Sequence, residues 1–276
     1  MRRARTRAYI PDTYWEEVAG RVATRDREAR SFAGDDSDFY RRKRAMFLER
    51  MLRPATEETH EVLEVGCGPG GNLAWLAERG KEVAGVDVSL RMLAHARELL
   101  PDIPLTLVDG RILPFADRSF ESVITVTVLQ HNPADIADAL IAELARTAAQ
   151  QVHLFEDTAW VSIHDRKSHW LRKPGWYVAR MTGAGFALET FERLPIAAEE
   201  LAANLARAAL ERGHREGGNV PSSRRRAEFA LCGAARLLDV ILPASAGLTR
   251  MSFRRRPTPD ACDAPMASIA RPSLNG

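Results

Sequence analysis

The chain has 276 residues, of which 45% are hydrophobic and 28% are charged, and its formal net charge is +2. This length suits one large domain with an appendage, and the charge is too small to indicate nucleic-acid binding by itself. No uncharged apolar run of about 18 residues occurs, and no apolar stretch follows the basic start MRRARTR, so we expect neither a transmembrane helix nor a secretory signal. The three cysteines, Cys67, Cys232 and Cys262, lack metal or disulfide spacing, which is typical of a cytoplasmic protein.

Regular structure is predicted to begin with a helix over 38–52, where apolar residues recur at helical spacing. Five strands and three helices then follow in the order EVLEVG, GNLAWLAERG, EVAGVDVS, LRMLAHARELL, IPLTLVDG, FESVITVTVL, PADIADALIAELARTAAQ and QVHLFED. This alternation of strands and helices is typical of a parallel sheet covered by helices on both faces, so the predicted fold class is α/β and doubly wound.

The pattern changes after the fifth strand. A helix ends near MTGAGF, FALETFERL is predicted to form a sixth strand, and GLTRMSFRRR is predicted to form a last, partly exposed strand. Between these two strands lie two Ala- and Leu-rich helices, around 197–212 and 223–242, joined by a breaker-rich linker. We therefore interpret 196–247 as a helical insertion between the two final strands.

The loop after the first strand, in VLEVGCGPGGNL, contains the spacing G-x-G-x-x-G through Gly66, Gly68 and Gly71. A strand that ends in glycines and leads into a helix directs backbone amides at a ligand. Asp87 follows Gly66 by about 20 residues, at the end of the second strand, where a carboxylate binds ribose hydroxyls. The loop and Asp87 together predict an adenosine-bearing ligand, and by themselves they fit NAD(P) as well as other cofactors.

Three features argue against a dinucleotide and leave an NAD-dependent dehydrogenase as the weaker alternative. Pro69 removes one amide donor from the loop. Glu64, just before the turn, would repel a pyrophosphate but suits a ligand that carries an ammonium and a sulfonium. Asp109, at the end of the third strand, can accept a hydrogen bond from an exocyclic adenine amine.

The motifs LEVGCGPGGN, GVDVS, DGRILPFADRSFESV and VLQHNP, in this order and spacing, resemble the class I S-adenosylmethionine-dependent methyltransferases. The resemblance is to the branch with ubiquinone-type and natural-product small-molecule enzymes. It is specific over 60–131 and looser beyond, and it implies a Rossmann-like seven-stranded sheet whose last strand is antiparallel. The first 35 residues and the segment 196–247 lie outside the shared pattern.

The resemblance implies a set of residues that bind S-adenosylmethionine. Glu64 would face the methionine amine, Asp87 the ribose hydroxyls, and Arg44 the methionine carboxylate. Further members are implied by their places in the motifs: Tyr40 closing over the carboxylate, Gly66, Cys67, Gly68 and Gly70 along the methionine half, Val88, Asp109 and Gly110 around adenine, and Thr125 and Gln130 near the sulfonium.

A catalytic base is less clearly marked in the sequence. His131 follows the fourth strand beside the expected methyl position, where it serves as a base or orders the loop. His164, oriented by Asp165, is a second candidate because the loop after the fifth strand usually lines the acceptor pocket. Glu156 and Asp157, at the end of that strand, are alternatives. A nearby set of aromatic residues either stacks on a flat acceptor or packs in the core: Trp160, Trp170, Trp176 and Tyr177.

The resemblance divides the chain into a core over 38–195 and a final strand over 248–256. We expect 1–37 to cover the active site, the insertion 196–247 to act as an acceptor lid or a dimer surface, and 257–276, which lacks periodicity, to be a disordered tail.

The predicted function is methyl transfer from S-adenosylmethionine, giving S-adenosylhomocysteine, to O or N of a small molecule, which we expect to be a specialised metabolite. No metal is expected. The partners are expected to be a small-molecule acceptor and, as one option, a second copy in a homodimer, with no membrane partner. The alternatives are a catalytically silent S-adenosylmethionine-binding subunit and, more weakly, an RNA methyltransferase that uses the arginines at 2, 3, 5, 7 and 224–226.

Overall fold

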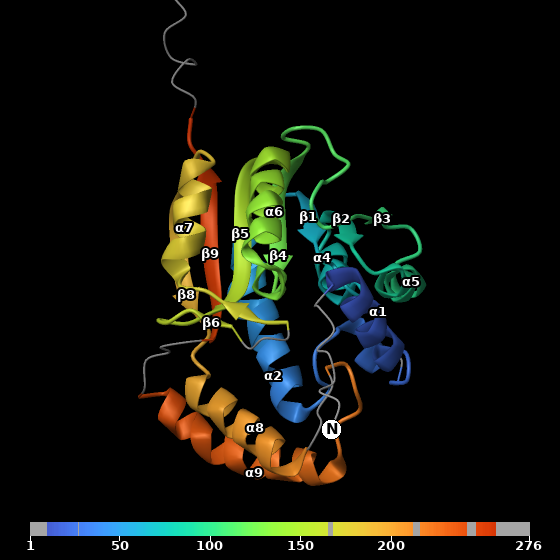
Figure 1. The fold of residues 1–276 in the computed structure, drawn as a ribbon, viewed down its shortest axis with the longest axis vertical. Coiled ribbons are helices and arrows are strands. Elements are labelled where there is room, and N and C mark those ends of the chain that lie inside the picture. The colour runs from blue at the N-terminus through green and yellow to red at the C-terminus, as the bar shows by residue number, and fades with distance from the viewer. Residues whose placement is uncertain (1–9, 27, 165–167, 212–215, 242–246, 258–276) are drawn as a thin grey trace, which may run out of the picture.

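A computed structural model describes residues 10–26, 28–164, 168–211, 216–241 and 247–257. Its centre is a seven-stranded sheet with the order β3-β2-β1-β4-β5-β9-β8 (Figure 1). The strands are β1 (Glu61–Val65), β2 (Glu82–Asp87), β3 (Leu105–Leu107), β4 (Phe120–Val126), β5 (Ala148–Thr158), β8 (Phe186–Arg193) and β9 (Gly247–Arg255). The first five are parallel, and β9 is antiparallel to both β5 and β8. The predicted α/β fold with an antiparallel last strand is confirmed.

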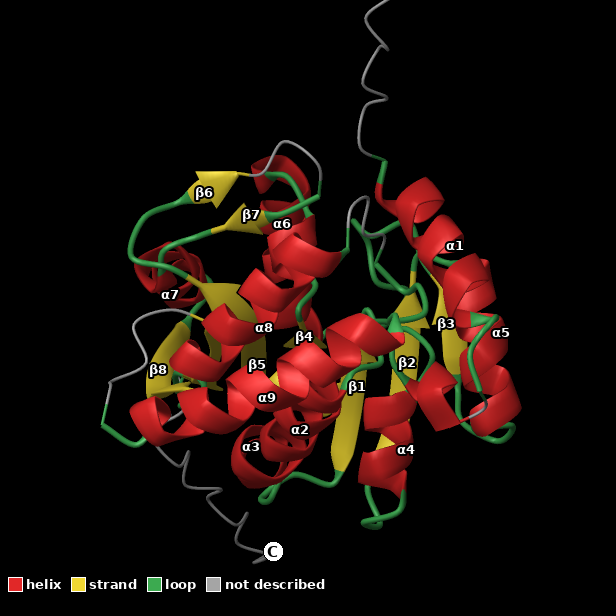
Figure 2. Cartoon of the chain, turned by 90° about the horizontal axis from the view of Figure 1, so that it is seen from below, coloured by secondary structure: helices red, strands yellow, loops and turns green. Residues whose placement is uncertain are grey.

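Helices cover both faces of this sheet, as Figures 1 and 2 show. On one face, α6 (Ala134–Thr147) and α7 (Pro174–Gly183) pack on the strands, and α6 buries Leu140, Ile141 and Leu144 at helical spacing. The opposite core contains residues of α2 (Asp38–Phe47) and α4 (Gly71–Ala77). The helix α5 (Leu90–Leu99) is capped at its N-terminus by Ser89, whose hydroxyl accepts from the amide of Met92.

Two predicted elements differ in their bounds. The helix expected over 38–52 ends as α2 at Phe47 and continues as a wide π-helical turn, Leu48–Leu52, and the short α3 (Arg53–Ala55). The helix expected to reach Gln150 ends at Thr147 because Ala148 already pairs with Phe120 in the sheet. A small second sheet, β6 (Ile163–His164) with β7 (Trp170–Leu171), was not predicted.

The N-terminal segment contains a helix that the sequence patterns did not reveal, α1 (Pro11–Val22). It begins with proline at its first position, which needs no amide partner there. Its buried residues Val18, Ala19 and Val22 pack with Met92 of α5. This contact places α1 at the carboxyl ends of the parallel strands, beside α5 in Figure 1.

The insertion forms two packed helices, α8 (Ala197–Leu210) and α9 (Ser222–Asp239), which lie below the sheet in Figure 1 and contact α2. Arg224 of α9 is fully buried. Its guanidinium pairs with Asp35 at 2.8 Å, with Glu228 at 2.6 Å and with Glu211. A single cation therefore joins both insertion helices to the segment that precedes α2.

The outward sides of α8 and α9 expose apolar side chains, including Leu201, Leu205, Phe229, Leu237 and Leu238. Such a surface is compatible with the dimer surface expected for the insertion, and homodimerisation stays a prediction. The expected tail 258–276 lies outside the described residues. In the described part of the chain, no helix has both the length and the apolar character needed to cross a membrane.

We predict that Arg224→Met lowers the free energy of unfolding by about 3–5 kcal/mol, because it leaves several carboxylates buried without their cation. Denaturant unfolding followed by circular dichroism measures this. Arg226→Met, at an exposed position of the same helix, is the control and should change stability by less than about 0.5 kcal/mol. Equal losses in the two variants would contradict the role given to Arg224.

Candidate functional site

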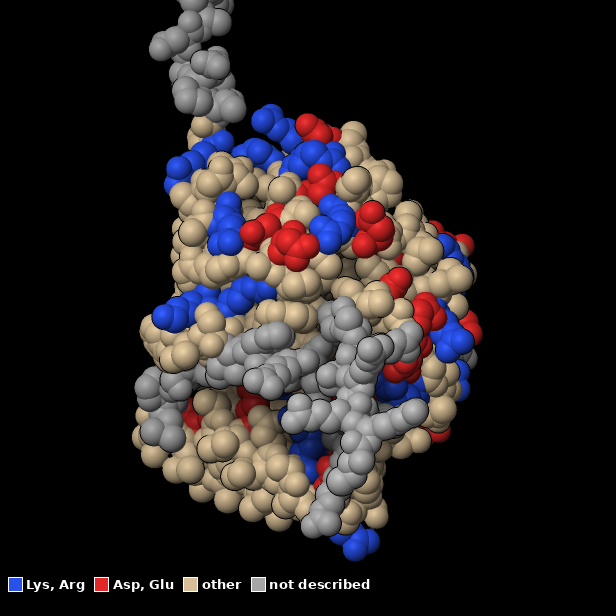
Figure 3. Space-filling model, in the orientation of Figure 1, with Lys and Arg blue, Asp and Glu red and all other residues tan. Residues whose placement is uncertain are grey.

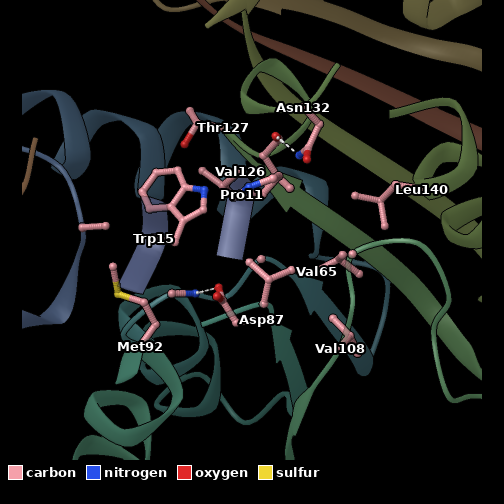
Figure 4. Close-up of a pocket in the computed structure, with 16 residues that line it drawn as sticks. Pro11, Trp15, Val65, Asp87, Met92, Val108, Val126, Thr127, Asn132 and Leu140 are labelled. Carbon is pink, nitrogen blue, oxygen red and sulfur yellow. Dashed lines mark hydrogen bonds between the residues drawn. The ribbon is translucent and has the colours of Figure 1, made fainter. Parts of the chain in front are cut away.

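Two adjoining cavities lie at the carboxyl ends of the parallel strands. The first is bounded by the ends of β1, β2 and β4 and by α1, and the second continues from it toward α2 and the insertion. They share six residues of their walls: Trp15, Ala33, Gly66, Gly68, Val126 and Thr127. Figure 4 shows the first cavity, with the indole of Trp15 on one side and Asp87 and Met92 on the other.

The glycine loop forms the floor between the cavities. Gly66 has a φ of +77°, and a Cβ there would lie 2.3 Å from a methyl group of Val128. At Gly71, a Cβ would lie 2.0 Å from the carbonyl oxygen of Ser31. Both positions therefore require glycine, because the chain passes too close to its neighbours for any side chain.

Asp87 anchors this loop from the end of β2. Its carboxylate accepts from the amide of Gly68 at 2.8 Å and from the amide of Ser89 at 2.9 Å. Burial raises the pKa of Asp87 to about 6, although both amide hydrogen bonds favour the charged form. Each oxygen keeps a lone pair for a further donor, so Asp87 can bind hydroxyl groups in the first cavity.

Glu64 is the most unusual group in the second cavity. It is 1% exposed, and only one of its oxygens is hydrogen-bonded, to the side-chain amide of Asn72 at 2.7 Å. The other oxygen, Oε2, has no hydrogen-bond partner among the described residues. Burial raises the pKa of Glu64 to about 8, while Asn72 and the positive charge of Arg44 act in the opposite direction. A buried acceptor beside a guanidinium suits a ligand with an ammonium and a carboxylate.

Glu156, one of the alternative bases, is hydrogen-bonded to the protein's own backbone and has a structural role. Its carboxylate accepts from the amides of Val128, Leu129 and Gln130, each at 3.1 Å, and from the hydroxyl of Thr125 at 3.2 Å. These bonds fix the short 3₁₀ helix Leu129–His131 against the sheet. The carboxylate is fully buried, both of its oxygens are hydrogen-bonded, and it lines neither cavity, so it shapes the cavity wall rather than facing a ligand.

The structure brings most of the predicted site residues to the cavity walls: Tyr40, Arg44, Glu64, Gly66, Cys67, Gly68, Asp87, Val88, Gly110, Gln130 and His131. Three others are not among the lining residues. Thr125 is buried against Glu156, and Gly70 is the N-cap of α4, where a Cβ would lie 3.0 Å from the Cβ of Ala96. Asp109 is exposed, and its Oδ1 accepts from two amides of its own turn, which lowers its pKa. An adenine contact through Asp109 stays a prediction.

His131 is held in one orientation by its Nδ1, which lies 2.9 Å from the carbonyl oxygen of Ser168. A carbonyl can only accept, so Nδ1 carries the proton and Nε2 is the basic nitrogen. Burial lowers the pKa of His131, which keeps the imidazole neutral at physiological pH. The ring packs edge-on against Trp15, with centroids 5.0 Å apart, and against His169, at 4.3 Å.

Two further predictions from the sequence concern His164, the second candidate base, and the set of aromatic residues. The backbone of His164 lies in β6, and its side chain, like the whole of Asp165, lies outside the described residues. Tyr177 is fully buried in the core, and Trp160 is 66% exposed. Neither of these two aromatic residues lines a cavity.

Several lining residues were missed by sequence reasoning. Lys43 projects from α2 into the second cavity, where its Nζ lies 2.6 Å from Glu200 of the insertion and 3.7 Å from Asp157. Trp15, His169 and Glu216 also line this cavity. One signal was present, because Lys43 lies three residues after Tyr40 and so on the same side of the helix.

Comparison with known proteins finds a domain match within the chain. Residues 62–151 match a family model described as a methyltransferase domain. The matched residues form the first part of the sheet, from β1 into β5.

Individual relatives match over shorter stretches. The chain is 37% identical over 94 residues to a methyltransferase named GfsG from Streptomyces halstedii, a match that covers 32% of this chain and 33% of that protein. Its fold is similar to that of the [4+2]-cyclase SpnF (TM-score 0.57, 18% identity, 88% of this chain and 92% of that one). It is also similar to magnesium protoporphyrin IX methyltransferase from Synechocystis PCC 6803 with bound S-adenosylhomocysteine (TM-score 0.55, 16% identity, 89% and 98%).

We predict that the stability of the ligand-free protein depends on pH through Glu64. Because its pKa is raised from 4.5 to about 8, the folded chain keeps a proton that the unfolded chain releases between these values. The contribution of this proton to the free energy of unfolding is fully present below about pH 4.5 and is lost as the pH rises through about 8. Glu64→Gln should therefore gain up to about 4 kcal/mol relative to the wild type between pH 5 and pH 9.

Thermal unfolding at a series of pH values measures this difference. Glu57→Gln, at an exposed position, is the control and should follow the wild-type curve. A Glu64→Gln curve parallel to the wild type throughout would mean that Glu64 is ionised in the ligand-free protein.

Proposed function

We propose that this chain is an S-adenosylmethionine-dependent methyltransferase that methylates O or N of a small molecule, in the class of specialised metabolites. The observation that carries the proposal is that Oε2 of Glu64 has no hydrogen-bond partner in the described part of the chain, although it is buried next to Arg44 and to the glycine loop. A methionine group supplies the ammonium and the carboxylate that these two side chains lack. The residues present therefore fit S-adenosylmethionine, which when bound supplies a methyl group already activated on sulfur.

The two cavities divide the ligand between them in this proposal. Asp87 receives the ribose hydroxyls, and apolar side chains of the first cavity, among them Val65, Val108 and Leu140, surround the adenine. Glu64 and Arg44 hold the methionine end in the second cavity. The wall formed by Val126 and Thr127 is common to both cavities and is the place for the reacting carbon.

The N-terminal segment and the insertion act as the cover of the acceptor. Trp15 of α1, Glu200 of α8 and Glu216 all line the second cavity, so three segments outside the family match close around it. Excluding water and aligning the acceptor with the methyl group can supply several kcal/mol of rate acceleration. Where the acceptor nucleophile must lose a proton, the basic Nε2 of His131 is the base that we propose.

A silent S-adenosylmethionine-binding subunit remains the second candidate, because a fold does not determine a reaction and one structural neighbour is named a cyclase. The exposed apolar sides of α8 and α9 favour it. RNA methylation has less support. Figure 3 shows basic side chains intermixed with acidic ones over the α6 and α7 face rather than gathered into one basic patch.

The first test is calorimetric titration of the full-length protein with S-adenosylmethionine, S-adenosylhomocysteine and NADH. We expect the first two to bind and NADH not to bind. In Asp87→Ala both affinities should fall by about a hundredfold, because hydroxyl contacts and the anchor of Gly68 are lost together.

Asp102→Ala, at an exposed position after α5, is the matched control and should bind like the wild type. Binding of NADH alone would contradict the proposal. Binding of S-adenosylmethionine without any turnover in an extract of the source organism would favour the silent subunit.

A further inference from the structure

The polar side chains of the second cavity define an acceptor chamber, by which we mean Lys43, Gln130, His131, Asp157, Glu200 and Glu216. Three of these residues are carboxylic acids and one is a lysine. They come from α2, the 3₁₀ helix, the end of β5, α8 and the segment before α9, so the chamber exists only in the folded chain. Among its described residues, negative charge exceeds positive charge.

Lys43 forms ion pairs with two neighbouring carboxylates. Its Nζ lies 2.6 Å from Glu200 and 3.7 Å from Asp157. Burial alone would lower the pKa of Lys43, but these two carboxylates outweigh it and hold the pKa above its ordinary value. Lys43 is therefore a poor ligand for an anionic acceptor, since an added anion would have to compete with two carboxylates.

Asp157 is held in a fixed position in the same chamber. Its amide donates to Oε1 of Gln130 at 2.6 Å, and its Oδ2 accepts from the Gln130 side-chain amide at 3.3 Å, so the residue is fixed in place. Its Oδ1 is buried and makes no hydrogen bond with the described residues, and the Nζ of Lys43 lies 3.7 Å from this atom, too far to donate a hydrogen bond to it. Buried acceptors in proteins are nearly always paired, and the missing group here is a donor.

We infer that the acceptor is an amine, bound among these carboxylates and methylated on nitrogen. This inference rests on the proposed function and narrows its choice between O and N. An amine enters as an ammonium, donates to Oδ1 of Asp157, and gives up one proton to Nε2 of His131 or to solvent before it reacts.

The sign of the charge change in the reaction favours nitrogen over oxygen. The nitrogen lone pair forms the N–C bond while the C–S bond breaks and its electron pair goes to sulfur, so the positive charge moves from sulfur to nitrogen. Carboxylates around the acceptor stabilise the new ammonium. The same carboxylates repel a carboxylate acceptor and raise the pKa of a hydroxyl acceptor, whose product keeps no positive charge for them to stabilise. They also raise the pKa of an ammonium, but the methylated nitrogen carries the positive charge that they stabilise.

The inference is tested by incubating the full-length protein with S-adenosylmethionine deuterated in its methyl group and a small-molecule extract of the source organism. Fragmentation mass spectrometry then locates the label. We expect labelled N-methyl products. Labelled ethers, esters or C-methyl products would overturn the inference and leave the methyltransferase proposal standing, whereas the absence of any labelled product would overturn the proposal and the inference with it.

Substitutions in the acceptor chamber provide a second test of the amine acceptor. Asp157→Asn removes the charge and keeps the size, and it should raise KM for the labelled acceptor about tenfold with little effect on S-adenosylhomocysteine affinity. Glu200→Gln should act in the same direction. Glu78→Gln, on an exposed side chain of the surface, should leave KM unchanged. An unchanged or lower KM in Asp157→Asn would show that the carboxylate does not bind the acceptor.

Discussion

The site depends on the cost of burying carboxylates at the ends of parallel strands. A buried carboxylate must be hydrogen-bonded or it shifts its pKa and takes up a proton. Glu64, Asp87 and Glu156 stand at the ends of β1, β2 and β5, and each meets this constraint to a different degree. Glu156 accepts four hydrogen bonds from its own chain, although burial still raises its pKa to about 7, Asp87 accepts two, and Glu64 retains an oxygen with no hydrogen-bond partner among the described residues. The degree of saturation separates a group that shapes the wall from groups that bind a ligand.

The cover of the site depends on a second buried charge. Arg224 joins Asp35 to both insertion helices, and the segment just before Asp35 contributes Phe32 and Ala33 to the second cavity. Buried ion pairs add little stability compared with apolar packing, but they fix the relative position of the elements that carry them. The position of Glu200 in the chamber is thereby linked to that of the N-terminal cover.

The parts of the site whose residues lie close together in the sequence could be predicted from the sequence. The glycine spacing and Asp87 were accessible because strand, turn and helix follow one another within a short stretch. The chamber was not accessible, since Lys43 meets Glu200 only after the chain has crossed the whole sheet. The role of Glu156 was also missed, because its four hydrogen bonds require the 3₁₀ turn to fold back onto β5. Patterns of hydrophobicity indicate elements but not which polar groups they bring together.

In this account, Glu64 accepts a hydrogen bond from the ammonium of the ligand when the ligand binds. This role is tested most directly by measuring proton release when S-adenosylhomocysteine binds at pH 7, using calorimetry in buffers with different ionisation enthalpies. Since the pKa of Glu64 is about 8 in the free protein, binding of an ammonium next to it should expel its proton. We predict proton release in the wild type and its loss in Glu64→Gln. Binding without proton release, or equal release in both proteins, would contradict the account.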